Sequence, residues 1–195
     1  MAVDLTKCVR LADSSIVRTA KGRLSYANLT KLTLMKGETD QEKARYSTSL
    51  LFNDKADLSE LIKLVNETAV EKWGADYAKK FKVKKPFLKV EDFPKMSDLV
   101  EKGFTVMIRV SSKTKPEIRL ANKMPADESD VYSGRWALIT VNAFTYDHPT
   151  GGKGVSLGLQ NVQLLDHDDR LGGGRASADD QFENLGDSVD TDPFA

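Results

Sequence analysis

Cysteine is scarce in this chain of 195 residues, and its shortage excludes two classes of structure. The single cysteine, Cys8, cannot form an intrachain disulfide, which excludes a disulfide-stapled scaffold and a zinc site built from four Cys ligands. No uninterrupted apolar run reaches ten residues, whereas a membrane helix needs about 20. Residues 1–7 also lack the apolar core of a signal peptide. We therefore expect a soluble intracellular protein that makes no membrane contact.

Basic residues are absent from the last twenty positions, although 29 Lys and Arg balance 29 Asp and Glu over the whole chain. The last twenty residues carry six acids, so residues 1–175 hold 29 bases against 23 acids, a net charge of +6. This asymmetry predicts a body that binds a polyanion and an acidic extension that imitates or competes with it. A tail that serves only solubility is the alternative.

Large apolar side chains are also few after residue 175, where Asp, Ser and Gly dominate. Such a segment cannot bury enough surface to offset the entropy lost on ordering. Three consecutive glycines, Gly172, Gly173 and Gly174, precede it and favour a flexible boundary. The sequence therefore predicts one folded domain over residues 1–172 and a disordered acidic tail over 173–195.

Alternation of apolar and polar residues predicts that the domain is mainly β. The clearest example is 103–111, where Phe104, Val106, Ile108 and Val110 share one face, leaving Thr105, Met107, Arg109 and Ser111 on a functional outer face. Other predicted strands are 7–11, 22–29, 45–52, 117–120, 135–146 and 155–165. Five or more strands suffice for a closed barrel or a sandwich.

One principal helix is predicted from Asp57 to Gly74. Asp57 and Glu60 have the spacing of a capping box, and apolar residues then recur at helical intervals up to Trp73. Residues 79–102 look like an irregular insertion, with a short helix near 76–81.

Six lysines and two aromatic residues alternate within 79–89. Lysines attract phosphates in any sequence context, and exposed rings stack on unpaired bases. The alternative is a solvated loop whose Phe81 and Phe87 fill the core. Cationic and aromatic residues are also neighbours on three predicted strands, at Arg23 and Tyr26, Arg45 and Tyr46, and Arg135 and Trp136.

Two further motifs are weak as catalytic or cofactor sites. The glycine-rich 151–154 lacks the spacing of a phosphate-binding loop and leads into a strand, so it favours a hairpin that presents Lys153 to a nucleic-acid backbone. Adjacent acids in 166–169 rarely converge on one ion. We expect no catalytic residue, no metal and no cofactor; a metal-dependent nuclease using Asp166 and Asp168 is the enzymatic alternative.

Several segments, in this order, resemble the bacteriophage single-stranded-DNA-binding proteins of the oligonucleotide-binding-barrel (OB-fold) type: 23–29, 45–52, 132–136, 153–155, 158–163 and 170–173. The resemblance implies a five-stranded barrel with a helix in one connection. It implies coating of single-stranded DNA during phage replication, recombination and repair, in the cytoplasm of the infected host. The acidic tail would recruit replication proteins such as a polymerase or helicase, and would occupy the DNA groove when DNA is absent.

These observations together predict a non-enzymatic single-stranded-DNA-binding protein. The phosphate contacts expected are Arg23, Lys31, Arg45, Lys84, Lys85, Arg109, Arg135 and Lys153, and the stacking residues are Tyr26, Tyr46, Tyr132, Trp136 and Phe144. The tail residues expected to bind partners are Asp179, Asp180, Glu183, Asp187, Asp190, Asp192 and Phe194. The sequence leaves open a homodimer, binding of duplex DNA, and an interaction protein that acts through its tail alone.

Overall fold

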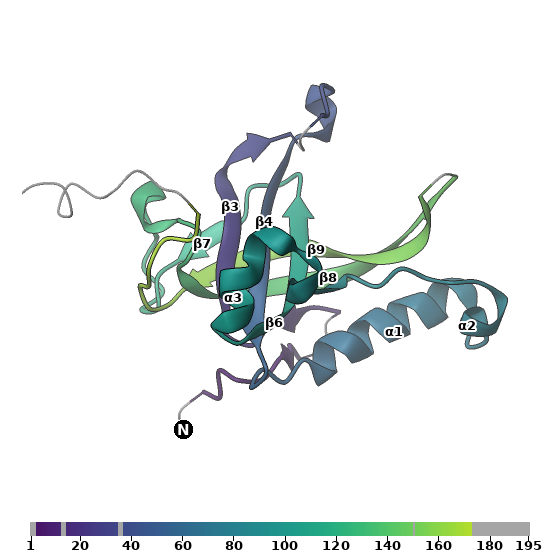
Figure 1. Ribbon diagram of the computed structural model, residues 1–195. Helices are drawn as coiled ribbons and strands as arrows, with labels where there is room; N and C mark the ends of the chain where they lie inside the picture. The colour runs from purple at the N-terminus through teal and green to yellow at the C-terminus, as the bar shows by residue number, and fades with distance from the viewer. Residues whose placement is uncertain (1–2, 13–14, 35–36, 150, 173–195) are drawn as a thin grey trace, which may run out of the picture.

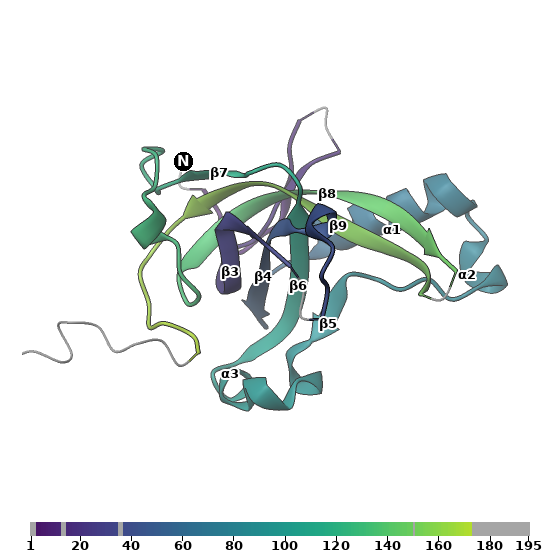
Figure 2. The ribbon, with the colours of Figure 1, turned by 90° about the horizontal axis from the view of Figure 1, so that it is seen from above.

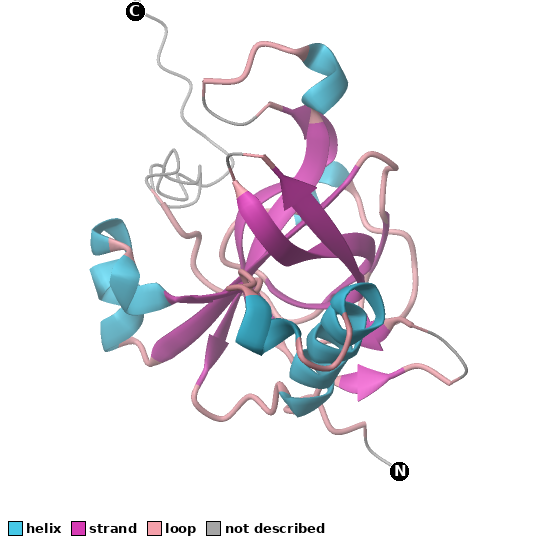
Figure 3. Ribbon diagram, turned by 90° about the vertical axis from the view of Figure 1, so that its right-hand side faces the viewer, coloured by secondary structure: helices cyan, strands magenta, loops and turns pink. Residues whose placement is uncertain are grey.

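Five long strands form the main body of the computed structural model, which describes residues 3–12, 15–34, 37–149 and 151–172. They are β3 (Gly22–Thr33), β4 (Arg45–Asn53), β6 (Phe104–Ser112), β8 (Trp136–His148) and β9 (Gly152–Leu164). Antiparallel pairs join β3 to β4, β4 to β6, β8 to β9 and β8 to β3, and β6 pairs with β9 in parallel. This path returns to its first strand, so the strands close into the expected barrel (Figure 3).

Shorter elements surround the barrel (Figure 1). They are β1 (Val9–Arg10), β2 (Val17–Arg18), β5 (Phe87–Lys89), β7 (Glu117–Arg119), α1 (Ser59–Trp73), α2 (Tyr77–Lys80), α3 (Ser97–Glu101) and the 3-10 turns η1 (Gln41–Lys43), η2 (Val90–Asp92), η3 (Pro94–Met96) and η4 (Glu128–Asp130). All seven predicted strands are confirmed. The sequence did not predict β2 and β5, which are too short to show alternation of apolar and polar residues. Within the described residues, no helix is long and apolar enough to cross a membrane. The predicted disordered tail, 173–195, lies outside the described residues.

The barrel interior is filled by alternate strand residues, as the pattern predicts. Leu24, Leu50, Phe52, Ile108 and Ile139 are fully buried in it. Burying one such side chain contributes roughly 1.5–3 kcal/mol. Helix α1 adds a buried stripe to the same cluster and packs against β8 and β9.

Helix α1 confirms the predicted helix, but the predicted capping box is wrong. The N–H of Asp57 is bonded to the Thr6 carbonyl at 2.8 Å and is therefore unavailable to the Glu60 side chain. Glu60 pairs instead with Arg10, and the Asp57 carboxylate accepts the N–H of Ser59 at 3.0 Å. Contacts of Asp57 and Glu60 with the N-terminal segment thus replace the capping box predicted at the start of α1.

The insertion between α2 and β6 covers part of the outer barrel surface. Met96 and Leu99 pack with Leu51 and Met107 in a second apolar cluster. Met107 is fully buried, although alternation placed it on the open outer face of 103–111. The outer surface of β4 and β6 is consequently covered at one end and open at the other.

Candidate nucleic-acid interface

Strand register defines which side chains share the open half of the outer surface, called here the outer face. Residues paired across neighbouring strands point to the same side. Ser25 pairs with Ser49, and Ser49 with Arg109, which places these three side chains in one row. The next row runs from Ser47 through Ser111 to Gly158 and Asn142. The floor of the outer face is therefore built mainly from small polar residues.

Two glycines of β9 allow side chains of β8 to lie flat on this floor. A Cβ on Gly154 would overlap the Tyr146 ring, and a Cβ on Gly158 would overlap the amide oxygen of Asn142. Phe144 lies between Asn142 and Tyr146 on β8, opposite Ser156, and is 45% exposed. The β8 edge of the outer face thus carries two rings, Phe144 and Tyr146.

Cationic groups border the same floor. Arg109 is exposed, and its guanidinium carbon lies 5.4 Å from the centre of the Phe93 ring, which belongs to the insertion. Lys84 forms a parallel bridge with Gly154, so its side chain shares the side of Tyr146. The outer face therefore combines rings and cations with a floor of small residues, of which Ser47 and Ser111 are partly exposed and Ser25 and Ser49 are buried.

Two projections flank the outer face. The outer ends of β3 and β4 rise from the barrel, and the β8–β9 hairpin extends away from it alongside α1 (Figures 1 and 2). Tyr26 lies at an irregularity of β3, has a positive φ of 51° and is 60% exposed. Arg45 and Tyr46 begin β4 and are partly buried; Arg45 donates to the carbonyls of Glu42 and Ala44. Lys31 pairs with Glu128 at 3.1 Å.

Four predicted contact residues lie instead beneath the C-terminal strap, residues 165–171. Arg23 is 4% exposed, and its guanidinium pairs with Asp168 at 3.0 Å. The indole N–H of Trp136 donates to Asp168 at 2.8 Å. Tyr132 hydrogen-bonds His167 at 3.0 Å, and the Arg170 guanidinium carbon lies 4.5 Å from the Tyr132 ring centre.

Arg135, the fourth, is also 4% exposed and pairs with Asp130 at 3.1 Å. Carboxylates and carbonyls of the protein already accept hydrogen bonds from both buried arginines. Their DNA contacts stay predictions, and we leave both arginines out of the outer face because it does not include them. Trp136 and Tyr132 are likewise held by the strap.

The acidic residues 166–169 form part of these contacts. Partial burial opposes ionisation of Asp168, but the Asp169 N–H, the Trp136 indole and the Arg23 guanidinium hold the pKa of Asp168 below its usual range. A hydrogen bond from Lys21 lowers the pKa of Asp166. The two carboxylates named for the nuclease alternative are thus directed at separate cations. Among the described residues, no three His, Cys, Asp or Glu side chains are placed to hold a metal ion.

Lys153 and Lys85 lie away from the outer face. Lys153 pairs with Asp147, and its ammonium lies 5.4 Å from the centre of the Phe81 ring beside α2. Lys85 donates to Asn66 of α1 at 2.9 Å.

Sequence reasoning missed the small-residue floor, Tyr146 and Phe93. The alternating small residues Ser47 and Ser49, and Ser156 and Gly158, were the signal that could have indicated the floor.

Comparisons with known proteins agree on one group. The family model described as the single-stranded-DNA-binding protein of Enterobacter phage Enc34 matches residues 15–193. The solved structure of that phage's protein in complex with single-stranded DNA is 18% identical, with a TM-score of 0.64 over 82% of this chain and 91% of that chain. The gp2.5 single-stranded-DNA-binding protein encoded by bacteriophage T7 is 15% identical, with a TM-score of 0.60 over 89% of this chain and 98% of that chain. At these identities the likeness to both structures shows a shared fold, and no curated protein matches the chain in sequence.

Proposed function

The chain belongs to the Enc34 family of phage single-stranded-DNA-binding proteins, and from this premise we propose that it binds single-stranded DNA along the outer face. One observation carries the proposal: strand register places the exposed side chains of Phe144 and Arg109 on the same side of the sheet, beside one floor of small residues. Tyr146 and Lys84 extend this face toward the end of the hairpin.

Binding would depend on stacking and charge without reading sequence. A base stacked on an aromatic ring contributes about 1–3 kcal/mol, and each phosphate neutralised releases counterions. Ser47 and Ser111 are partly exposed on this floor, and their hydroxyl groups can donate to phosphate or base oxygens. No step of this process breaks a covalent bond, so the proposed role is not enzymatic.

The salt dependence of binding tests this mechanism. If about four phosphates are engaged, log affinity should fall with log salt at a slope near −0.7 × 4, roughly a fiftyfold loss between 50 and 200 mM. Fluorescence anisotropy of a labelled oligo(dT) measures the slope directly. Salt-independent affinity, or no binding at low salt, would reject the proposal and favour an interaction protein that acts through its tail alone.

In this role the protein would coat and protect single strands during phage replication, recombination and repair, in the host cytoplasm. The acidic tail would recruit a replication protein, such as a polymerase or helicase, and compete with DNA for the cationic surface. Its proposed contact residues are Asp179, Asp180, Glu183, Asp187, Asp190, Asp192 and Phe194, all outside the described residues. The charge of −6 against +6 in residues 1–175 supports this competition.

Removal of residues 176–195 should raise the affinity for oligo(dT) several-fold, because it removes six negative charges that compete with DNA. The gain should be largest at low ionic strength and should shrink as screening shortens the Debye length toward about 8 Å at 0.15 M salt. Parallel titrations of the full chain and the truncated chain at 20 and 200 mM salt measure both effects. Equal affinities at 20 mM would show that the tail does not compete with DNA.

A further inference from the structure

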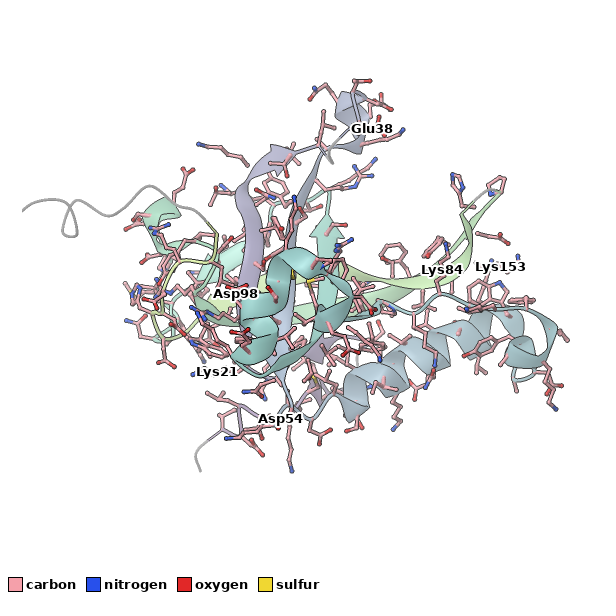
Figure 4. The ribbon with its side chains drawn as sticks, viewed as in Figure 1. Lys21, Glu38, Asp54, Lys84, Asp98 and Lys153 are labelled. Carbon is pink, nitrogen blue, oxygen red and sulfur yellow. The ribbon has the colours of Figure 1, made fainter. Side chains whose placement is uncertain are left out.

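Four lysines lie on or near α2 and the neighbouring part of α1, on a part of the molecule that the outer face does not include. Lys79 and Lys80 belong to α2, Lys85 reaches Asn66 of α1, and Lys153 lies over Phe81. We call these four residues the α2 lysine surface. The first three are exposed and Lys153 is partly buried. Figure 4 shows Lys153 near the end of the β8–β9 hairpin, with Lys84 close by.

The aromatic rings at this surface are occupied by one another. The Trp73 ring centre lies 6.4 Å from that of Tyr77 and 5.8 Å from that of Phe81. All three rings are partly buried, and Trp73 and Tyr77 also pack against the core. The α2 lysine surface therefore offers charge to a ligand without offering a ring for base stacking.

Part of this charge is unpaired. Lys79 contacts Asp76 at 3.5 Å and Lys153 pairs with Asp147, but no ion pair within the described part of the chain includes Lys80 or Lys85. Asn66, the hydrogen-bond partner of Lys85, is neutral. The four ammonium groups thus exceed the two carboxylates paired with them.

The hairpin separates the α2 lysine surface from the outer face. Successive strand residues point to opposite sides, and the pair Asp147 with Lys153 directly follows the pair Tyr146 with Gly154. Lys153 consequently faces Phe81, whereas Tyr146 and Lys84 face the other side. Two nucleic-acid segments bound on opposite sides of the hairpin would not overlap sterically, and salt would screen the repulsion between them.

We propose that the α2 lysine surface binds the phosphate backbone of duplex DNA while the outer face holds an unpaired strand, so that one molecule grips a junction between the two. A surface with charge but no free ring gains most from the polyanion of higher charge density, and duplex DNA carries one charge per about 1.7 Å. Unpaired bases gain their extra affinity from rings, which lie on the outer face. The simultaneous grip rests on the proposed function of the outer face; the duplex site does not.

The test uses the full chain with Lys79→Ala, Lys80→Ala and Lys85→Ala combined. A charge-matched control replaces Lys7, Lys55 and Lys102, three exposed lysines elsewhere on the molecule, with alanine. Anisotropy would be measured with a 20-base-pair duplex, with oligo(dT), and with the duplex carrying an oligo(dT) extension. For the duplex, the slope of log affinity against log salt should be about 0.9 × 3 shallower for the test variant than for the unchanged chain. Raising the salt from 50 to 200 mM should therefore reduce the duplex affinity of the test variant by a factor about fortyfold smaller than for the unchanged chain.

Affinity for oligo(dT) should stay within a factor of two of the unchanged chain, and the control variant should resemble the unchanged chain on all three probes. The unchanged chain should prefer the junction to either part, and the test variant should lose that preference. Unchanged duplex affinity would overturn the proposal, as would an equal loss on oligo(dT) and duplex, which would indicate one shared site. Failure of the unchanged chain to bind oligo(dT) would instead reject the proposed function and the junction grip, leaving the duplex result to be judged alone.

Discussion

Replacing Arg23 with methionine should lower the free energy of unfolding by about 3 kcal/mol, because the guanidinium is buried and its partner Asp168 is partly buried. The guanidinium pairs with Asp168 and also donates to the carbonyls of Gly134 and Asp169. Methionine retains much of the volume but leaves the carboxylate and both carbonyls without these donors. The strap would lose its main attachment to β3.

Thermal unfolding measures this loss, and a domain of this size should melt about 6–12 °C lower. Arg109→Met is the matched control, because Arg109 is also an arginine on a barrel strand but is exposed beside Phe93. That variant should keep its melting temperature and bind oligo(dT) more weakly. A stable Arg23→Met variant with greatly weakened DNA binding would show that Arg23 contacts DNA, as its sequence context indicated.

The fold could be predicted from local patterns because its five barrel strands are long. In β6, Ile108 and Val110 alternate with Arg109 and Ser111 over enough residues to define an inner side. Strands β2 and β5 have two and three residues, too few for a period to be visible. The predicted capping box failed for a different reason, since the Asp57 N–H donates to the carbonyl of Thr6, a residue 51 positions away.

The site was harder to predict because burial of its residues depends on distant segments. Arg23 and Arg109 both lie on predicted strands, and nothing in their neighbours distinguishes them. The strap covers Arg23, whereas the insertion contacts Arg109 only through the Phe93 ring and leaves its side chain exposed. Similarly, Trp136 looked available for stacking, but Asp168 accepts its indole N–H. Conversely, Ser47, Ser111 and Gly158 form one floor only after β4, β6 and β9 pair.

Replacing Phe144 with alanine should weaken binding of oligo(dT) by about 5- to 150-fold, the effect of losing one stacked base at about 1–3 kcal/mol. The ring is 45% exposed and lies between Asn142 and Tyr146 on the β8 edge of the outer face. Because it is far from fully buried, its removal should leave the melting temperature nearly unchanged. Affinity and stability should therefore separate, which they would not do for a ring that belongs to the core.

Two further variants decide whether the Phe144 effect arises from stacking. Phe144→Trp keeps an aromatic ring at the same position and should retain or improve affinity, since any ring offers a face to a base. Val70→Ala removes an exposed apolar side chain, 41% accessible, from α1 and should change neither affinity nor melting temperature. If Phe144→Ala bound oligo(dT) normally while Arg109→Met did not, no base would stack on Phe144, and the path of the strand would lie nearer β6 than β8. Loss of affinity in Phe144→Trp as well as in Phe144→Ala would instead mean that the size of the side chain, and not its aromatic face, is what the bound strand requires.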